Sequence, residues 1–193
     1  GEFGGLGLVV KGHTWREGGW GYDLFGSQEA LAQRFEDLYV TIDRARKEQG
    51  LSAAVYTQTS DVETENNGLL TYDRAETKIP FYAVRLVNRG YFAPRVVRGA
   101  PIFVDSVAVA LMSPSPGAAI HYTVDGTTPR LFAPVYQRPF SLAQTATVKA
   151  RSRYLDGTWS RVTSFGFAQV APREAPPVDG ALPGIEVDYF EQD

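Results

Sequence analysis

The chain has 193 residues, of which 44% are hydrophobic, and it carries 22 acidic and 19 basic side chains for a formal net charge of −3. This length and charge density are typical of one or two folded domains, not of a disordered chain. The absence of cysteine excludes disulfides, thiolate nucleophiles and cysteine-ligated zinc. Because the net charge is slightly negative and no apolar run approaches the ~20 residues of a membrane span, we expect no nucleic-acid partner and no membrane partner.

The beginning of the chain is unusual. The first residue is Gly1, the only methionine is Met112, and no basic stretch precedes an apolar core near the N-terminus. These features are typical neither of a native start nor of a signal peptide. We therefore expect the chain to be a piece of a longer protein.

Proline and charge divide the chain into segments. Residues 1–79 contain no proline, whereas all twelve prolines fall between Pro80 and Pro183. Residues 101–170 carry three acids and six bases, and residues 171–193 carry six acids and one base. We expect a first domain over 1–92, a linker over 93–101, a second domain over 102–170, a linker over 171–184 and the start of a further module over 185–193.

The clearest element of the first segment is a helix over residues 28–49. Apolar residues recur at spacings of four and three, which forms one stripe along a helix: Leu31, Phe35, Leu38, Ile42 and Ala45. Ser27 is a suitable N-cap, and Gly50 supplies the left-handed residue that ends such a helix.

The segment after this helix alternates strand and helix signals. Residues 51–58 form a short, mostly apolar run without polar alternation, which is typical of a strand covered on both faces. Pro80 then begins a predicted second helix through Asn88. This order predicts the last two βα units of a (β/α)₈ TIM barrel. Two units alone leave open strand edges, so the segment should depend on missing units for stability.

The second segment has a period of two. Polar and apolar residues alternate over 119–124 and 147–154, which predicts half-exposed antiparallel strands, and the alternation puts His121 on the solvated face. Two Asp-Gly pairs, at 125–126 and 156–157, predict tight hairpin turns. We expect a small antiparallel β-sandwich, so the fold class is multi-domain: α/β followed by all-β.

Functional residues of barrels lie after the strands, here in residues 1–26 and 56–74. Glu2 precedes a glycine-rich loop, so it is either a catalytic acid or nucleophile or an ordinary acid near a terminus. His13 and Trp15 belong to a loop rich in aromatic residues (12–22), which either stacks on sugars or pins the loop to the surface.

The loop after residue 58 is also polar. Gln58, Asp61 and Glu63 either line a pocket or belong to a solvated loop. The run beginning at Asp61 differs from a calcium loop because it has no glycine at the sixth place and has Tyr72 at the twelfth. No nucleotide, dinucleotide or metalloprotease motif is present, so we expect neither metal nor cofactor.

Several stretches of the first segment resemble the end of the catalytic barrel of glycoside hydrolase family 2, and above all its large bacterial members. These stretches are residues 2–7, 12–15, 50–63 and 67–74. The family includes β-galactosidases, β-glucuronidases and β-mannosidases. The resemblance implies a carbohydrate substrate and a nucleophile at Glu2, which ends the seventh barrel strand. It sets Tyr56 near the place where well-known members carry a tryptophan under the sugar. We add His13, Trp15, Gln58 and Asp61 as candidate substrate-binding residues.

Residues 102–168 resemble the chitobiase/β-hexosaminidase C-terminal domain, an Ig-like sandwich. The resemblance rests on the stretches 113–117, 120–129 and 147–151 and implies an accessory domain without catalytic residues. Residues 183–190 resemble the opening strand of a further sugar-binding module.

Retaining glycosidases need two carboxyl groups ~5–5.5 Å apart. The resemblance supplies Glu2 as nucleophile and implies an acid/base glutamate from the fourth barrel strand, upstream of Gly1. We therefore expect a fragment of a retaining glycoside hydrolase that is inactive alone; the alternative is a non-catalytic carbohydrate-binding or structural module. The multi-modular character of a glycan-degrading protein suggests a secreted or periplasmic location, whereas the sugar, the linkage and the oligomeric state stay open.

Overall fold

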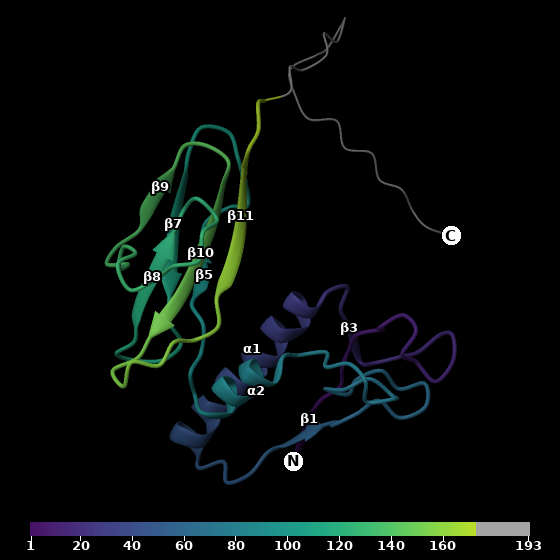
Figure 1. The fold of residues 1–193 in the computed structure, drawn as a ribbon. Coiled ribbons are helices and arrows are strands. Elements are labelled where there is room, and N and C mark those ends of the chain that lie inside the picture. Colours follow the sequence, from purple (N-terminus) through teal and green to yellow (C-terminus); the bar gives the residue numbers. More distant parts are fainter. Residues whose placement is uncertain (173–193) are drawn as a thin grey trace, which may run out of the picture.

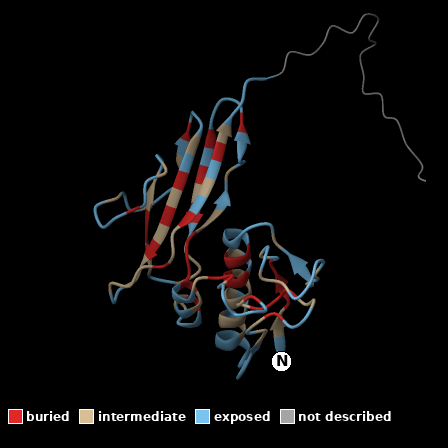
Figure 2. Ribbon diagram, turned by 45° about the vertical axis from the view of Figure 1, so that its right-hand side comes forward, coloured by how far each residue is buried: buried red, intermediate tan, exposed pale blue. Residues whose placement is uncertain are grey.

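The computed structural model describes residues 1–172, which form an α/β part followed by a β-sandwich (Figure 1). The expected further module at 185–193 and almost all of the expected linker at 171–184 lie outside the described residues. Figure 2 shows two groups of buried positions, one along the long helix and its neighbours and one along the strands of the sandwich. Each part therefore has its own apolar core.

The α/β part has four short strands and two helices. In chain order these are β1 (Glu2–Gly4), β2 (Leu6–Gly7), β3 (Asp23–Leu24), α1 (Gln28–Gln49), β4 (Val55–Thr57) and α2 (Phe81–Asn88). Strand β1 pairs in parallel with β4, and β2 pairs in parallel with β3. Helix α1 lies within the connection between the parallel strands β1 and β4, as an α/β crossover requires.

Helix α1 has the bounds and caps that the sequence predicts. The Ser27 side chain accepts a hydrogen bond from the Ala30 N–H, and Gly50 takes the left-handed conformation with φ of 70°. Leu31 and Phe35 are each only 1% exposed, so the apolar stripe faces the core. The ring of Phe35 meets the ring of Tyr56 from β4 at a centroid distance of 5.1 Å, which packs the helix on the sheet.

The prediction of a partial TIM barrel is wrong. The described residues are mostly β-structure with two helices, and β1 and β4 pair only with each other in a two-stranded sheet. The predicted buried strand is reduced to three residues, and residues 51–55 are exposed, with Val55 at 59%. The alternation of helix and strand signals is a local pattern that does not require a barrel. One parallel pair of strands, β1 and β4, with α1 between them in the chain produces the same pattern. The first part is a small α/β unit.

The second part is the predicted β-sandwich. Its strands are β5 (Arg95–Arg98), β6 (Ile102–Phe103), β7 (Val107–Met112), β8 (Ala119–Thr123), β9 (Phe140–Leu142), β10 (Ala146–Arg153) and β11 (Thr163–Gln169). One sheet has the order β6-β11-β10-β8 and the other the order β5-β7-β9. All pairs are antiparallel except β6 with β11. Val109, Val148 and Ala150 are fully buried between the sheets.

Two local predictions for the sandwich need correction. Gly157 has a φ of 82° in a tight turn that brings Arg153 opposite Trp159, as expected. Gly126 also has a positive φ, but it begins the long connection from β8 to β9, which lies in the other sheet, so no hairpin forms there. His121 is not solvated: it is 5% exposed, its Nδ1 lies 3.1 Å from the Ala133 carbonyl oxygen, and its ring meets that of Trp159 edge-on.

Candidate functional site

The carboxylate of Glu2 lies on the open face of the β1–β4 sheet. Successive strand residues point to opposite faces, and Phe3 packs against Tyr39 of α1 at a centroid distance of 5.2 Å. Glu2 therefore points away from the helix, beside its register partner Val55, which is 59% exposed. Glu2 is itself exposed, so its carboxylate is accessible on this face.

The loops that follow β1 and β4 are joined by backbone hydrogen bonds. Trp20 donates its N–H to the Thr64 carbonyl at 2.9 Å, and Asn66 donates its N–H to the Trp20 carbonyl at 2.8 Å. Nearer the strands, Gly5 donates to the Thr57 carbonyl at 2.9 Å. Residues 5–22 and 58–78 therefore form one surface, which we call the loop surface, at the carboxyl ends of β1 and β4.

A buried ion pair between Lys78 and Asp61 lies beneath the loop surface and stabilises it. Lys78 Nζ lies 2.5 Å from Asp61 Oδ1, and both side chains are almost completely buried. The same carboxylate oxygen accepts the Gly68 N–H at 2.8 Å, and Lys78 also donates to the Asn66 carbonyl. Burial raises the pKa of Asp61 and lowers the pKa of Lys78, while the hydrogen bond between them opposes both shifts. The carboxylate of Asp61, a residue predicted to bind substrate, is therefore occupied by contacts that stabilise the loop.

Gln58 is held by a chain of side-chain amides. Its Nε2 donates to Asn67 Oδ1 at 2.7 Å, and Asn67 Nδ2 donates to Glu65 Oε1 at 2.8 Å. Asn67 is fully buried, whereas Gln58 is half-buried. One of the two N–H donors of the Gln58 amide is therefore already paired with the loop.

His13 and Trp15 meet the second loop at its far end. His13 Nδ1 lies 2.7 Å from Asp73 Oδ2, and the ring of Trp15 lies 4.9 Å from the ring of Tyr72 between centroids. Hydrogen bonds from Thr71 and His13 lower the pKa of Asp73 to about 2. The structure thus brings His13 and Trp15 together on the loop surface, with Tyr72 and Asp73 as partners.

Tyr56 lies on the opposite side of the sheet from Glu2. Its ring packs between Phe3 and Phe35, at centroid distances of 5.4 and 5.1 Å. Burial is the main cause that raises its pKa well above the usual range. The register pairs Tyr56 with Phe3, so Tyr56 belongs to the face that α1 covers. The strand alternation turns Tyr56 toward the core, on the face opposite Glu2.

The loop surface exposes aromatic rings. Their exposed fractions are 53% for Trp15, 46% for Trp20, 81% for Tyr22 and 36% for Tyr72. Tyr22 packs on Gly5, where an added Cβ would lie 2.7 Å from the ring, so the glycine is needed for this close approach. The sequence did not predict individual roles for Trp20, Tyr22 and Tyr72. The alternation of glycine with aromatic residues over 18–22 is a signal for the first two only. Exposed rings beside polar groups can stack on sugars.

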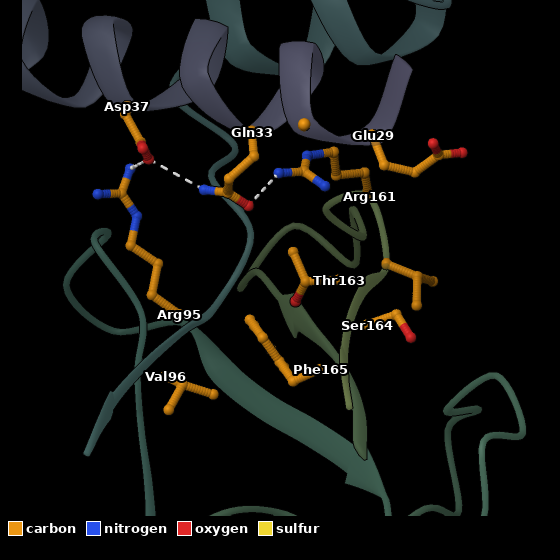
Figure 3. A pocket seen from close by; sticks show the side chains of 11 residues that line it. Glu29, Gln33, Asp37, Arg95, Val96, Arg161, Thr163, Ser164 and Phe165 are labelled. Carbon is orange, nitrogen blue, oxygen red and sulfur yellow. Dashed lines mark hydrogen bonds and ion pairs between the residues drawn. The ribbon is translucent and has the colours of Figure 1, made fainter. Parts of the chain in front are cut away.

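A cavity of about 530 Å³ lies elsewhere, between α1 and the sandwich (Figure 3). The polar side chains on its walls are paired with one another: Arg161 donates to Gln33 Oε1 at 2.6 Å, and Arg95 lies 2.6 Å from Asp37. None of the predicted site residues lines it. Its walls are therefore part of the contact between the two parts of the chain.

Among residues 1–172, no group of three or more histidine and acidic side chains is placed to hold a metal ion. Within the same range, neither helix is long and apolar enough to cross a membrane.

Comparison with known proteins identifies part of the sandwich. Residues 109–167 match the family model described as Fn3 associated, which covers the chain from β7 into β11. This match supports an Ig-like, fibronectin-III-associated domain and not the chitobiase C-terminal domain specifically. No curated protein matches the chain.

Proposed function

We propose that this chain acts on carbohydrate, and that Glu2 is the nucleophile of a retaining glycoside hydrolase similar to β-galactosidases, β-glucuronidases and β-mannosidases. The observation that carries the proposal is the exposed position of Glu2 on the open face of β1–β4, the two strands whose carboxyl ends lead into the aromatic loop surface. Because the described residues form no barrel, the proposal rests on this local arrangement and not on the fold class.

The loop surface supports the sugar-binding half of the proposal. Trp20 and Tyr22 lie edge to face at 5.5 Å, and both rings remain substantially exposed. Such rings bury the apolar faces of sugars at little cost in conformational entropy. His13 and Asp73 add polar groups beside Trp15, which is the combination that a sugar-binding site needs.

The chemistry requires a second carboxyl group. In a retaining mechanism a Glu2 oxygen forms a bond to the anomeric carbon while an acid protonates the departing oxygen. The proposal assigns that acid to a residue outside this chain. The chain alone should therefore not turn over ordinary aryl glycosides, whose leaving groups need the proton.

A trapping experiment tests Glu2 without the missing acid. The chain is incubated with 2,4-dinitrophenyl 2-deoxy-2-fluoro-β-glycosides of the three sugar types, and labelled peptides are sequenced by mass spectrometry. The Glu2 carboxylate forms an ester to the anomeric carbon, and dinitrophenolate leaves with the bonding electrons, so no proton donor is required. We expect an adduct on Glu2 that is absent in Glu2→Gln. Labelling elsewhere, or none at saturation, would overturn the assignment of Glu2.

A non-catalytic carbohydrate-binding module is the second candidate. The exposed rings and the Fn3-associated match favour it, because neither requires a nucleophile. The same trapping experiment separates the two candidates when sugar binding is measured in parallel. Binding with no adduct supports the module, and an adduct on Glu2 supports the enzyme.

A further inference from the structure

A row of cations follows the outer face of strand β10. Val148, Ala150 and Ser152 point into the sandwich and are fully buried. The alternate residues Lys149, Arg151 and Arg153 therefore point outward, and each is half-buried. Because a strand rises about 3.4 Å per residue, neighbouring members of the row lie about 7 Å apart.

Trp159 fixes the central member of this row. The Arg151 guanidinium carbon lies 3.8 Å from the centroid of the Trp159 ring, and that of Arg153 lies 5.8 Å away. The buried His121 supports the ring edge-on at 5.0 Å. A guanidinium that lies against an aromatic face is held by the cation–π attraction, while its N–H donors lie in its own plane, around its edge.

The cations of the row have no acidic partner within the described residues. The ion pairs there include none of Lys149, Arg151, Arg153 or the nearby Arg130. Two of the three acids of the sandwich are engaged locally, since Asp125 accepts from Thr127 and Asp156 accepts from Tyr91 and Thr158. The row therefore carries its positive charges without an ion pair to any acid of the described residues.

Arg151 also has an unused donor. Its Nε is buried and makes no hydrogen bond in the described structure. Burial lowers the pKa of this guanidinium, and the adjacent charge of Arg130 lowers it further. A bound anion would offset the repulsion between the Arg151 and Arg130 guanidinium groups.

We propose that the outer face of β8–β10, centred on Arg151 and Trp159, binds a linear anionic polysaccharide through its carboxylate groups. A row of cations at regular spacing fits repeated negative charges better than it fits one small anion. The planar guanidinium groups of Arg151 and Arg153 can each donate two parallel hydrogen bonds to a carboxylate. This surface belongs to the sandwich and contains no residue of the loop surface, so it is independent of Glu2.

Binding of polygalacturonate to the full chain tests this proposal. The affinity is measured at low ionic strength by titration calorimetry, with neutral galactan as the comparison ligand. Arg151→Gln is expected to weaken polygalacturonate binding at least tenfold. Arg138→Gln, which removes the same charge from an exposed position of the same sandwich outside the row, should change the affinity less than twofold. Denaturation midpoints establish that both variants remain folded.

Three outcomes would overturn the proposal. These are no binding of polygalacturonate, equal effects of the two substitutions, and tighter binding of single-stranded DNA than of polygalacturonate. If Arg151→Gln unfolds the chain, Arg153→Gln and Trp159→Phe replace it with the same expected loss. Glu2→Gln should leave polygalacturonate binding unchanged, so a failure here is distinguishable from a failure of the proposed nucleophile.

Discussion

Arg161 and Glu36 join the two parts of the chain although they are 125 residues apart. Arg161 Nε lies 2.5 Å from Glu36 Oε2, and the other carboxylate oxygen accepts the N–H of Ala93. Glu36 is fully buried, whereas the Arg161 side chain is 12% exposed. One carboxylate of α1 thus holds both the start of the sandwich and the turn before β11.

Replacing Glu36 should therefore destabilise the chain strongly. Glu36→Ala removes the carboxylate that pairs with the Arg161 guanidinium and leaves the buried Ala93 N–H without its acceptor, which we expect to lower the free energy of unfolding by about 3–5 kcal/mol. Urea denaturation measures this loss. Glu48→Gln, at an exposed position of the same helix, should change stability by less than about 0.5 kcal/mol. Equal stabilities of the two variants would contradict the role of Glu36.

The buried pair under the loop surface should show strong coupling. Lys78→Met leaves the Asp61 carboxylate buried without its cation and should cost about 3–5 kcal/mol. The double variant Asp61→Asn with Lys78→Met removes both charges, so it should cost less than the sum of the two single changes. A double-mutant cycle by urea denaturation measures the difference. Additive losses would show that the pair does not act as a unit.

Gly68 should not tolerate a side chain. A Cβ built there would lie 2.3 Å from the backbone N of Asp61, and backbone atoms cannot move aside cheaply. Gly68→Ala is therefore expected to lower stability by about 1–3 kcal/mol. Gly26→Ala is the control, since nothing lies within 4 Å of its added carbon. Thermal midpoints of the two variants compare them directly, and a neutral Gly68→Ala would argue against the described loop path.

The contact between Asp73 and His13 should weaken in acid. The pKa of Asp73 is lowered to about 2, so the carboxylate is stabilised by folding. Its contribution is present above the ordinary pKa of 3.8 and is lost as the pH falls toward 2. The difference in thermal midpoint between wild type and Asp73→Asn should therefore shrink over this range. Asp105→Asn, an exposed control, should give a difference that does not depend on pH in this way.

Local sequence patterns predicted the elements but not their assembly. The spacing of Leu31 and Phe35 and the caps of α1 are short-range signals, and the helix has the predicted bounds. The length of the strand after α1 depends on which strands pair with it. In the described structure β4 pairs with β1 over three residues only, and residues 51–55 stay exposed. The pattern therefore predicted a barrel that the chain does not form.

Long-range contacts decide most of the site. Lys78 pairs with Asp61 seventeen residues away, and nothing in the local sequence marks either as buried. His121 alternates onto an outer face, yet Trp159 and the loop at Ala133 cover it. Glu2 and the aromatic loop could be proposed as site residues from the sequence, because acidic, polar and aromatic residues lie close together along this part of the chain.

The three tryptophans provide the most direct test of the carbohydrate-binding claim. Trp15 and Trp20 lie on the loop surface, whereas Trp159 lies on the sandwich. Indole N–H signals are recorded by NMR while methyl β-galactoside, β-glucuronide or β-mannoside is added to the full chain, and variants with single Trp→Phe changes assign them. We predict that the Trp15 and Trp20 signals shift with at least one of these sugars, while the Trp159 signal does not shift with the neutral galactoside or mannoside. A shift of Trp159 alone, or no shift with any of the three sugars, would contradict the account.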